Sequence, residues 1–541
     1  MITYLYATNP CASLVETRNL ICRLYGMCEH SSKFSSPCNL PLDTRIVMLD
    51  AADLSEPSSS GIIRNIMREL HGTLLVFFSS INTYSEAQRA GIYALLDLSP
   101  QSALKFADNS DPPFLSDVIH ADSCSGLLDS VHTISLVGDG YQSLATHFGA
   151  SFVLRTSKLS VDIVAIGSHE LFRYPQILNP PNQHLLDTLV AGNATPAARL
   201  FTASVGDILW SDIVADKPES APHISVEAHR EELNAIQQTY LSGSPDTSCE
   251  AWLERAELAY SEIPSGIRRE VLRFRKHCNS ASYLLIKGFP TDPALPPTPL
   301  LPTETASKQT FVAEFWLTAI ATGLGEPIGY KQQKGGRLLH NITPTVRGKD
   351  AVTSESSSSA LSFHSEAPFH PLAPKFIVFT CLRPEPCAYT EICSVGTIYY
   401  HSSLHTIYAL EKTLFNFYCD FAGTSRGTKT QPVKAPICTP AVPYPILRFD
   451  PENMASSDPE SPALLQHVLS LANAHHDRVC LEPGDIVIVN NYHCVHGRTV
   501  FNARFDGTDR WHQRIYVIPS LSTSQSPSIQ HFNNIVHSDF E

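Results

Sequence analysis

The sequence has few charged residues, no long apolar run and no run of basic residues, and each absence narrows the class of protein. Charged residues make up 17% of the 541, and the net charge is −14. No stripe of Lys and Arg offsets this negative charge, which argues against nucleic acid as a partner. No stretch approaches the roughly 20 apolar residues that cross a membrane, and the first residues lack the pattern of a secretory signal. We therefore expect a cytoplasmic protein that binds neither nucleic acid nor membranes.

Paired cysteine motifs are also missing. The 14 cysteines are scattered, without repeated C-x-x-C pairs, which argues against zinc ribbons and favours a reducing, intracellular setting. The chain is too long for one typical core, and 43% hydrophobic residues supply ample material for several. Residues 216–222 (DKPESAP) are rich in Pro, Ser and acidic residues and predict a linker. We expect an α+β protein with one domain over residues 1–220 and a second over 225–541.

Short apolar runs alternate with helix-like segments in residues 1–220. The predicted strands are 45–50, 73–78, 133–137 and 161–166, and amphipathic segments such as 62–70 and 85–96 lie between them. This rhythm predicts an α/β, Rossmann-like domain with a largely parallel sheet.

One segment of this domain suggests nucleotide binding. In TISLVGDGYQSLATHFGASFVLR (133–155), a strand is followed by Gly138-x-Gly140-x-x-Ser143, and we expect a helix and a second strand ending at Arg155. That order is close to a dinucleotide-binding βαβ unit, and an Arg at that place suits a 2′-phosphate. The alternative is a glycine-containing turn in a domain that binds no nucleotide. Three roles stay open for the domain: a dimerisation or lid-forming appendage, a nucleotide-binding domain that has lost its role, and a second enzyme. We expect the first, with a homodimer formed through it.

Beyond the linker the pattern changes to helices followed by many short strands. Helices are predicted at 226–241, 267–277 and 311–322, and strands at 282–290, 376–382, 397–400, 445–449, 485–489 and 513–518, with a strand pair within 329–344. Short strands separated by Pro- and Ser-rich turns favour a β-sandwich or jelly roll. The serine-rich stretch 350–362 is either a lid over a site or a solvated surface loop.

The stretch LSFHSEAPFH (361–370) carries the first sign of chemistry. His364 and Glu366 are two apart in a run that is typical of a strand, where residues i and i+2 share a face. Two His and one carboxylate form the site of many non-haem Fe(II) enzymes. A third ligand must come from far along the chain, facing the first two across the barrel, and the segment 484–519 offers His493 and His496.

Two arginines follow the last of these histidines. A guanidinium makes two parallel hydrogen bonds to a carboxylate, so Arg510 and Arg514 near an iron could clamp two acids, the co-substrate 2-oxoglutarate and the substrate. In the alternative interpretation they form structural ion pairs with Asp506 and Asp509.

Taken together, these segments resemble the clavaminate synthase-like (TauD/TfdA-type) family of Fe(II)/2-oxoglutarate-dependent oxygenases. The resemblance rests on FHSEAPFH, FTCLR and VHGRTVFNARFDGTDRWHQR, and extends through SYLLIKGFP, GEPIGY and GGRLLHNITP over roughly residues 225–541. It implies a double-stranded β-helix (jelly roll) with flanking helices, which uses Fe(II), 2-oxoglutarate and O2.

The resemblance also implies roles for individual residues. The iron ligands would be His364, Glu366 and His496. Arg510, with Thr390, would bind the distal carboxylate of 2-oxoglutarate, while Arg514 would take the α-carboxylate of an amino-acid substrate and Gln333 would lie near its amine. His370 would be structural or support the site, and His493 would be a turn residue. The implied reaction is C–H hydroxylation, desaturation or oxidative cyclisation of a free amino acid or small derivative in specialised metabolism. The alternative is a non-catalytic jelly-roll binding module, with any activity in an N-terminal nucleotide-binding domain.

Overall fold

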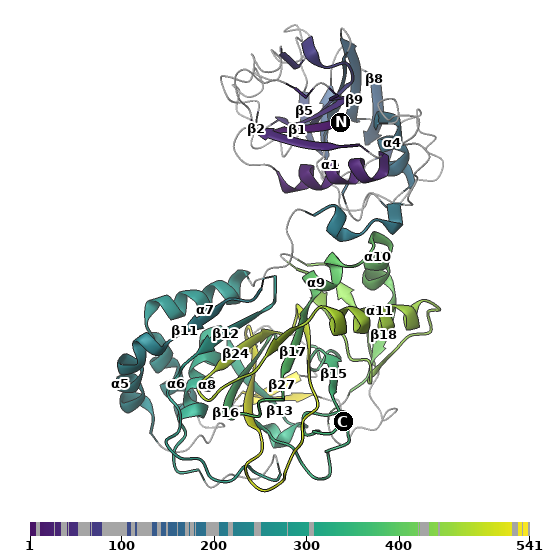
Figure 1. The fold of residues 1–541 in the computed structure, drawn as a ribbon. Coiled ribbons are helices and arrows are strands. Elements are labelled where there is room, and N and C mark those ends of the chain that lie inside the picture. The colour runs from purple at the N-terminus through teal and green to yellow at the C-terminus, as the bar shows by residue number, and fades with distance from the viewer. Residues whose placement is uncertain are drawn as a thin grey trace. The chain divides into compact units, whose positions relative to one another are not determined.

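The computed structural model divides the chain into two units (Figure 1). One unit holds Met1–Lys217 together with His401–Tyr408, and the other holds Pro218–Tyr400 and Ala409–Glu541. The structure describes residues 1–6, 11–25, 27–33, 40–41, 43–51, 53, 65–66, 68–77, 105–109, 114–115, 133–137, 142–147, 150–158, 161–167, 172–173, 178, 180–190, 205–214, 220–242, 250–277, 280–301, 308–419, 421, 432–441, 444–521, 529–532 and 534–538.

The first unit is built on an eight-stranded sheet. Its order is β2-β1-β3-β4-β10-β9-β8-β6, with bounds β1 (Ile2–Tyr6), β2 (Glu29–Lys33), β3 (Ile46–Asp50), β4 (Thr73–Phe77), β6 (Phe114–Leu115), β8 (Gln142–His147), β9 (Ala150–Lys158) and β10 (Val161–Ile166). The first five strands of this order run parallel. Strands β3 and β4 are buried along their whole length, as parallel strands covered on both faces are. Helices α1 (Ala12–Tyr25) and α4 (Pro180–Val190) supply apolar residues to the same core.

The predicted βαβ unit is wrong. Residues 142–147 form strand β8 where the helix was expected, and β8 pairs antiparallel with β9. Only two residues separate these strands in the sequence, which is the length of a hairpin loop and too short for a parallel crossover. Arg155 lies on β9 and forms an ion pair with Asp162 of β10. Strand β7 (Thr133–Val137) pairs with β5 (Lys105–Asn109) instead. Gly138, Gly140 and the segment 85–96 lie outside the described residues.

The second unit contains a large and a small sheet that carry the candidate site. The large sheet has the order β11-β12-β24-β16-β26-β13-β28-β27, with β14 also paired to β26, and comprises β11 (His223–Ser225), β12 (Tyr283–Lys287), β13 (Glu326–Tyr330), β14 (Leu339–Ile342), β16 (Phe376–Arg383), β24 (Ile486–Asn490), β26 (Trp511–Ile518), β27 (Ile529–Phe532) and β28 (Ile535–Ser538). The small sheet has the order β15-β25-β17-β23, from β15 (Leu361–His364), β17 (Thr390–Ser394), β23 (Asp477–Val479) and β25 (Cys494–Arg498). This two-sheet arrangement is that of a jelly roll.

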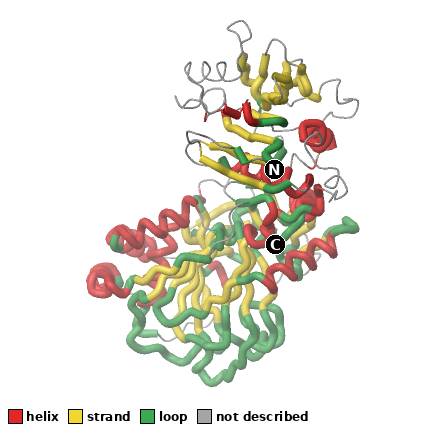
Figure 2. The backbone as a smooth tube through the Cα atoms, turned by 45° about the horizontal axis from the view of Figure 1, so that its top comes forward, coloured by secondary structure: helices red, strands yellow, loops and turns green. Residues whose placement is uncertain are grey.

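Helices cover the outer face of the large sheet. They are α5 (Arg230–Tyr240), α6 (Glu250–Glu262), α7 (Ser265–His277) and α8 (Val312–Leu324). Figure 2 shows the strands of this unit gathered in its middle with helices at both sides. Helix α8 lies directly on β16 and β26, and it is buried on nearly all sides because α6 and α7 pack over it. Among the described residues, no helix is long and apolar enough to cross a membrane.

Two local predictions in this unit need correction. Strands β13 and β14 do not pair with each other, because each pairs with β26. Residues 395–400 form helix α9 (Val395–Tyr400) in place of the predicted strand, and the Ser394 hydroxyl accepts a hydrogen bond from the Thr397 N–H at the start of this helix. This cap favours the helix over the strand preference of Thr397-Ile398-Tyr399. Helices α10 (Leu404–Lys412) and α11 (Ser461–Ala474) were not predicted. The remaining short strands are β18 (Leu414–Phe417), β19 (Val433–Pro436), β20 (Cys438–Thr439), β21 (Ile446–Leu447) and β22 (Met454–Ala455).

A buried polar cluster fixes the start of α8 against β26. Lys308 Nζ lies 2.9 Å from Asp292 Oδ2 and 2.7 Å from Glu314 Oε2, and all three side chains are at most 4% exposed. Asp292 accepts hydrogen bonds from the first N–H groups of α8, at Val312 and Ala313. Glu314 Oε1 accepts a hydrogen bond of 2.9 Å from the Gln513 side chain on β26. The cluster therefore connects the helix to the outer face of the strand.

We predict that Lys308→Met lowers the free energy of unfolding of the second unit by about 3 to 5 kcal/mol, because two buried carboxylates lose their cation. Chemical denaturation followed by the fluorescence of the buried tryptophans measures this change. The matched control is Lys349→Met, since Lys349 is 49% exposed and its nearest carboxylate oxygen is 3.9 Å away. Equal effects of the two substitutions would contradict the prediction.

Candidate metal centre and acid-binding residues

Three side chains from the small sheet and the bend beside it form a candidate metal centre. His364 is the last residue of β15 and the Cα partner of His496 on β25, so their rings lie side by side with centroids 4.5 Å apart. Glu366 lies two residues beyond the end of β15, in a bend where Ala367 has a φ of 48°. Two geometric expectations are therefore wrong: Glu366 is not on the strand, and His496 is on the neighbouring strand rather than across the barrel.

The three side chains offer a nitrogen, nitrogen and oxygen donor set. One ligand atom from each lies within 4.8 Å of the others, and His364 Nε2 is 3.9 Å from Glu366 Oε2. In the part of the chain that the structure describes, this is the one group of three or more His, Cys, Asp and Glu residues that meets such a spacing. His364 Nδ1 is bonded to the Ser362 carbonyl oxygen at 2.8 Å, which leaves Nε2 available as a ligand. The donor set is that of the mononuclear non-haem Fe(II) site.

Burial and charge keep these ligands ready for a cation. Burial, together with the neighbouring His364, lowers the pKa of His496 to about 3, so its imidazole is neutral. Its Nδ1 atom is buried and has no hydrogen-bond partner among the described residues. Burial would raise the pKa of Glu366, but Arg514, His364 and the Tyr516 hydroxyl outweigh burial and lower it to about 2. A neutral imidazole and an ionised carboxylate are the forms that bind a metal.

Glu366 is held at both its carboxylate and its backbone. Arg514 Nη1 donates to Oε2 at 2.9 Å, and the Tyr516 hydroxyl donates to Oε1. The Asn491 side chain accepts from the Glu366 N–H at 2.7 Å and donates to its carbonyl oxygen at 3.0 Å. Asn491 thus fixes the bend that carries Glu366. Its role was missed in the sequence, where Asn490-Asn491 indicates only a turn.

Arg510 is a buried cation without a carboxylate partner among the described residues. It is 5% exposed, and a hydrogen bond of 2.9 Å joins its Nη2 to His512 Nδ1. Its Nε is buried and has no partner there, and burial lowers its pKa to about 10. A guanidinium in such a position needs an anion.

The predicted alternative, ion pairs with Asp506 and Asp509, is wrong. Asp509 accepts hydrogen bonds from the backbone N–H groups of Arg504 and Phe505. Asp506 accepts from the backbone and hydroxyl of Thr508. The carboxylate partner of Arg514 is Glu366, on another part of the chain.

Thr390 and Gln333, the other predicted binding residues, lie on elements that adjoin this site. Thr390 is the first residue of β17 and is the Cα partner of Arg498 on β25. Two residues further along β17, Ile392 is the Cα partner of His496. Gln333 precedes a short 3-10 helix (Lys334–Gly336), and its Oε1 is buried without a partner among the described residues. The chain then enters β14, where His340 is the Cα partner of Arg514.

The two extra histidines lie outside the group of three. His493 is in the turn between β24 and β25, with Nδ1 on the Pro445 carbonyl oxygen at 2.9 Å. His370 Nδ1 accepts from the Leu372 N–H, its ring lies 4.8 Å from the Tyr330 ring, and burial lowers its pKa to about 3. The hydrogen bond of His493 joins segments 48 residues apart and that of His370 is local, and both are structural.

The serine-rich segment is anchored beside the site. Ser356 and Ser357 are 0% and 2% exposed, so the interpretation as a solvated loop is wrong for them. Arg498 donates to the Ser356 carbonyl and hydroxyl oxygens and to the Ser359 carbonyl oxygen. At the other side of the segment, Glu355 forms an ion pair with Lys334.

Sequence reasoning also missed the residues between and beside the two arginines. Arg510, His512, Arg514 and Tyr516 alternate with Trp511, Gln513, Ile515 and Val517. Polar residues at every second position of a strand indicate one polar face. That pattern could have predicted that Tyr516 lies on the same face as Arg514, the face that contacts Glu366.

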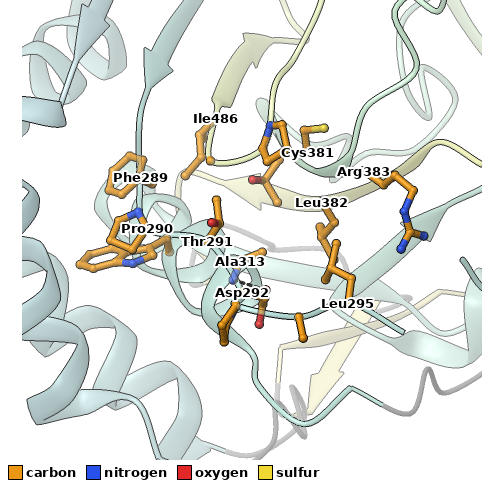
Figure 3. Close-up of a pocket in the computed structure, with 16 residues that line it drawn as sticks. Phe289, Pro290, Thr291, Asp292, Leu295, Ala313, Cys381, Leu382, Arg383 and Ile486 are labelled. Atoms are coloured by element: carbon orange, nitrogen blue, oxygen red, sulfur yellow. Dashed lines mark hydrogen bonds between the residues drawn. The ribbon is translucent and has the colours of Figure 1, made fainter. Parts of the chain in front are cut away.

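A cavity of about 330 Å³ lies at the start of α8 and the end of β16, and none of the candidate metal ligands lines it (Figure 3). Asp292 and Arg383 are its charged residues. Asp292 is already bonded to Lys308 and α8, and Arg383 donates to the carbonyl oxygens of Pro296 and Gly507. The chemistry of the chain therefore points to the His-Glu-His group and not to this cavity.

A two-sheet core with a His-Glu-His group and a buried unpaired arginine defines the class of non-haem iron oxygenases that use a 2-oxo acid. Residues 307–516 match the taurine catabolism dioxygenase TauD, TfdA family, and this chain belongs to that family. The predicted resemblance and the jelly-roll core are thereby confirmed. The protein is a 2-oxoglutarate-dependent dioxygenase that uses Fe(II) and O2.

Several relatives are similar to this chain over its second unit. L-asparagine oxygenase of Streptomyces coelicolor is 31% identical over 295 residues, which cover 53% of this chain and 86% of that protein. Clavaminate synthase 2 of Streptomyces clavuligerus is 27% identical, and the matched residues cover 55% of this chain and 92% of that protein. A solved structure of asparagine oxygenase with Fe(II), 3-hydroxyasparagine and succinate has a TM-score of 0.54 and 26% identity, covering 58% of this chain and 99% of that one.

Proposed function

We propose that His364, Glu366 and His496 hold the Fe(II), and that the enzyme oxidises a C–H bond of a free amino acid or a small amino-acid derivative. The proposal rests chiefly on one observation, the convergence of one ligand atom from each of these three side chains within 4.8 Å of the others. Arg510, a buried guanidinium with no carboxylate partner among the described residues, supports it. Support for the substrate class comes from the relatives, whose names include asparagine, lysine and clavaminate. Hydroxylation, desaturation and oxidative cyclisation all remain within this proposal.

Bound Fe(II) would supply the activation of O2 by oxidative decarboxylation of 2-oxoglutarate to succinate. The residues of the chain position the reactants around it. Ser362 fixes the ring of His364, while Arg514 and Tyr516 keep Glu366 ionised and oriented. Arg510, with the Thr390 hydroxyl, would take the distal carboxylate of 2-oxoglutarate, because a buried guanidinium gains most from an anionic partner.

Arg514 is proposed to bind the α-carboxylate of the substrate, and Gln333 to lie near its amine. Arg514 Nη1 is 2.9 Å from Glu366 Oε2, so an acid bound to the same guanidinium would lie next to the metal ligands. Gln333 offers a buried amide oxygen, which suits an ammonium donor. This arrangement would hold the two charged groups of an amino acid and leave its side chain directed by the surrounding loops.

We predict that anaerobic addition of Fe(II) and 2-oxoglutarate produces the weak visible charge-transfer band of the chelate. His364→Ala should abolish both the band and substrate-dependent succinate formation, because one of three ligands is lost. His493→Ala is the matched control, since its Nδ1 is bonded to Pro445 outside the group. Full succinate formation by His364→Ala would overturn the assignment of the metal ligands.

A panel of free amino acids scored by succinate release should identify the substrate, and the product mass should report the reaction. Gain of one oxygen atom means hydroxylation, and loss of two hydrogens means desaturation or ring closure. With the substrate found, Arg514→Met should raise its KM by roughly 10-fold or more, because a charge-assisted bidentate contact is lost.

Tyr516→Phe controls for the support that Arg514 gives to Glu366, since Tyr516 contacts the same carboxylate. A similar rise in KM in both variants would mean that Arg514 acts only through Glu366 and does not hold the substrate.

For the first unit we propose a dimerisation appendage, or a lid-forming one, in a cytoplasmic enzyme. Its own core and its lack of candidate iron ligands in the described ranges support a role outside the chemistry. A Rossmann-like nucleotide site remains the alternative: the parallel strands have the order β2-β1-β3-β4-β10, which is the 2-1-3-4-5 order of one class of doubly wound sheets.

Light scattering of the full chain should give the mass of a dimer, and a thermal-shift screen with NAD(H) and NADP(H) should give no shift. A monomer at every concentration would contradict the dimer. A clear shift would favour the nucleotide site.

A further inference from the structure

We propose that Arg498 is a second cationic residue of the co-substrate pocket, and that it couples binding of the distal carboxylate of 2-oxoglutarate to the order of the serine-rich segment 350–362. This inference rests on the proposed function of the site, in which Arg510 takes the same carboxylate. Nothing in the motif reasoning above assigns Arg498 a role.

Arg498 is buried, and not all of its N–H donors are used by the contacts of the described residues. It is 4% exposed and, in the described ranges, has no carboxylate within ion-pair distance. A guanidinium has five N–H donors, and three are used by Ser356 O, Ser356 Oγ and Ser359 O. Its Nε is buried and has no partner among the described residues. All of its hydrogen-bond acceptors are neutral, and among the described residues its charge is met by the Phe501 ring, whose centroid lies 5.0 Å from Cζ, and not by an anion.

The position of Arg498 places this charge next to the proposed pocket. It lies two residues after His496 on β25, so both side chains project from the same face of the strand. It is also the Cα partner of Thr390, which shares that face. Arg510, like Arg498, is buried and lacks a carboxylate among the described residues, whereas Arg514 is paired with Glu366. The charge of Arg510 contributes to lowering the pKa of Arg498, so the two guanidiniums lie near each other. Two such cations, one of them on the residue opposite Thr390, suit a carboxylate better than either would alone.

The acceptors of Arg498 explain why the serine-rich segment should respond to the co-substrate. Ser356 and Ser359 are held to β25 by the guanidinium, and Phe501 N–H donates to the Ser357 carbonyl oxygen at 2.9 Å. A carboxylate that attracts Arg498 would fix the guanidinium in place, and thereby the segment that it binds. The same segment leads into β15 and His364. Arg498 is therefore a positioning residue as well as a source of charge.

The experiment compares two 2-oxo acids on the Fe(II)-loaded full chain under anaerobic conditions, by calorimetry and by the charge-transfer band. 2-Oxopentanoate has the chelating end of 2-oxoglutarate and lacks the distal carboxylate. Arg498→Gln should lower the affinity for 2-oxoglutarate by roughly 10- to 100-fold, which is the range for the loss of a charged hydrogen-bond partner. It should leave the affinity for 2-oxopentanoate unchanged within about 2-fold, since this acid has nothing for Arg498 to hold.

Amide exchange of residues 350–362 supplies a readout that does not depend on turnover. In the wild type, 2-oxoglutarate should slow exchange of this segment and 2-oxopentanoate should not. Arg498→Gln should lose that protection. Arg498→Lys keeps the charge without the planar fork, so it should retain most of the affinity and lose most of the protection. If the Gln variant fails to fold, the Lys variant still tests the inference through the loss of protection in the presence of 2-oxoglutarate.

Arg504→Gln is the matched control, because Arg504 is 50% exposed and bonded to Thr508 of its own loop. It should bind both acids as the wild type does. Equal weakening of the two acids by Arg498→Gln, or unchanged exchange of the segment, would overturn the inference and leave the proposed function intact. Absence of the chelate band in the wild type would overturn the proposed function itself.

Discussion

The alternation of side chains along β26 is the constraint on which the site depends. The strand is central in the large sheet, paired to β16 on one side and to β13 and β14 on the other. Its alternate residues His512, Arg514 and Tyr516, with Arg510 directly before the strand, carry the polar groups of the site, while Ile515 and Val517 belong to the apolar core beneath α8. Because the side-chain period is two, a slip by one residue would exchange these sets. The polar cluster of Glu314 and Gln513 opposes such a slip from the outer face.

Burying two guanidiniums, one on β26 and one directly before it, is costly, and the structure compensates them differently. Arg514 is neutralised by Glu366, which in turn becomes an ionised candidate metal ligand. Arg510 is hydrogen-bonded to a histidine nitrogen and has no carboxylate partner among the described residues. Arg514 thus stabilises the candidate metal-ligand carboxylate, beside which the substrate acid is proposed to bind, whereas Arg510 suits the distal acid of the co-substrate. This difference, more than the presence of two arginines, separates an iron-supporting role from a co-substrate role.

The sequence predicted which residues matter better than it predicted how they meet. The spacing of His364 and Glu366 and the distant His496 identified the group, and the long motif around Arg510 identified the family. The geometry was wrong because β15 ends at His364 and the following bend is held by Asn491, a contact across 125 residues. Likewise, the cap from Ser394 and the short hairpin between β8 and β9 decided local structure against propensity. The Asn491 contact is tertiary, whereas the cap and the hairpin are local, and none of the three leaves a periodic signal.

The small sheet explains why metal and co-substrate sites would respond to each other. Strand β25 lies between β15 and β17, so His364, His496 and Thr390 come from three adjacent strands in a fixed register. Arg498 extends that register by two residues towards the serine-rich segment. Binding of a carboxylate at Arg498 would therefore act on β25, the strand that also carries His496.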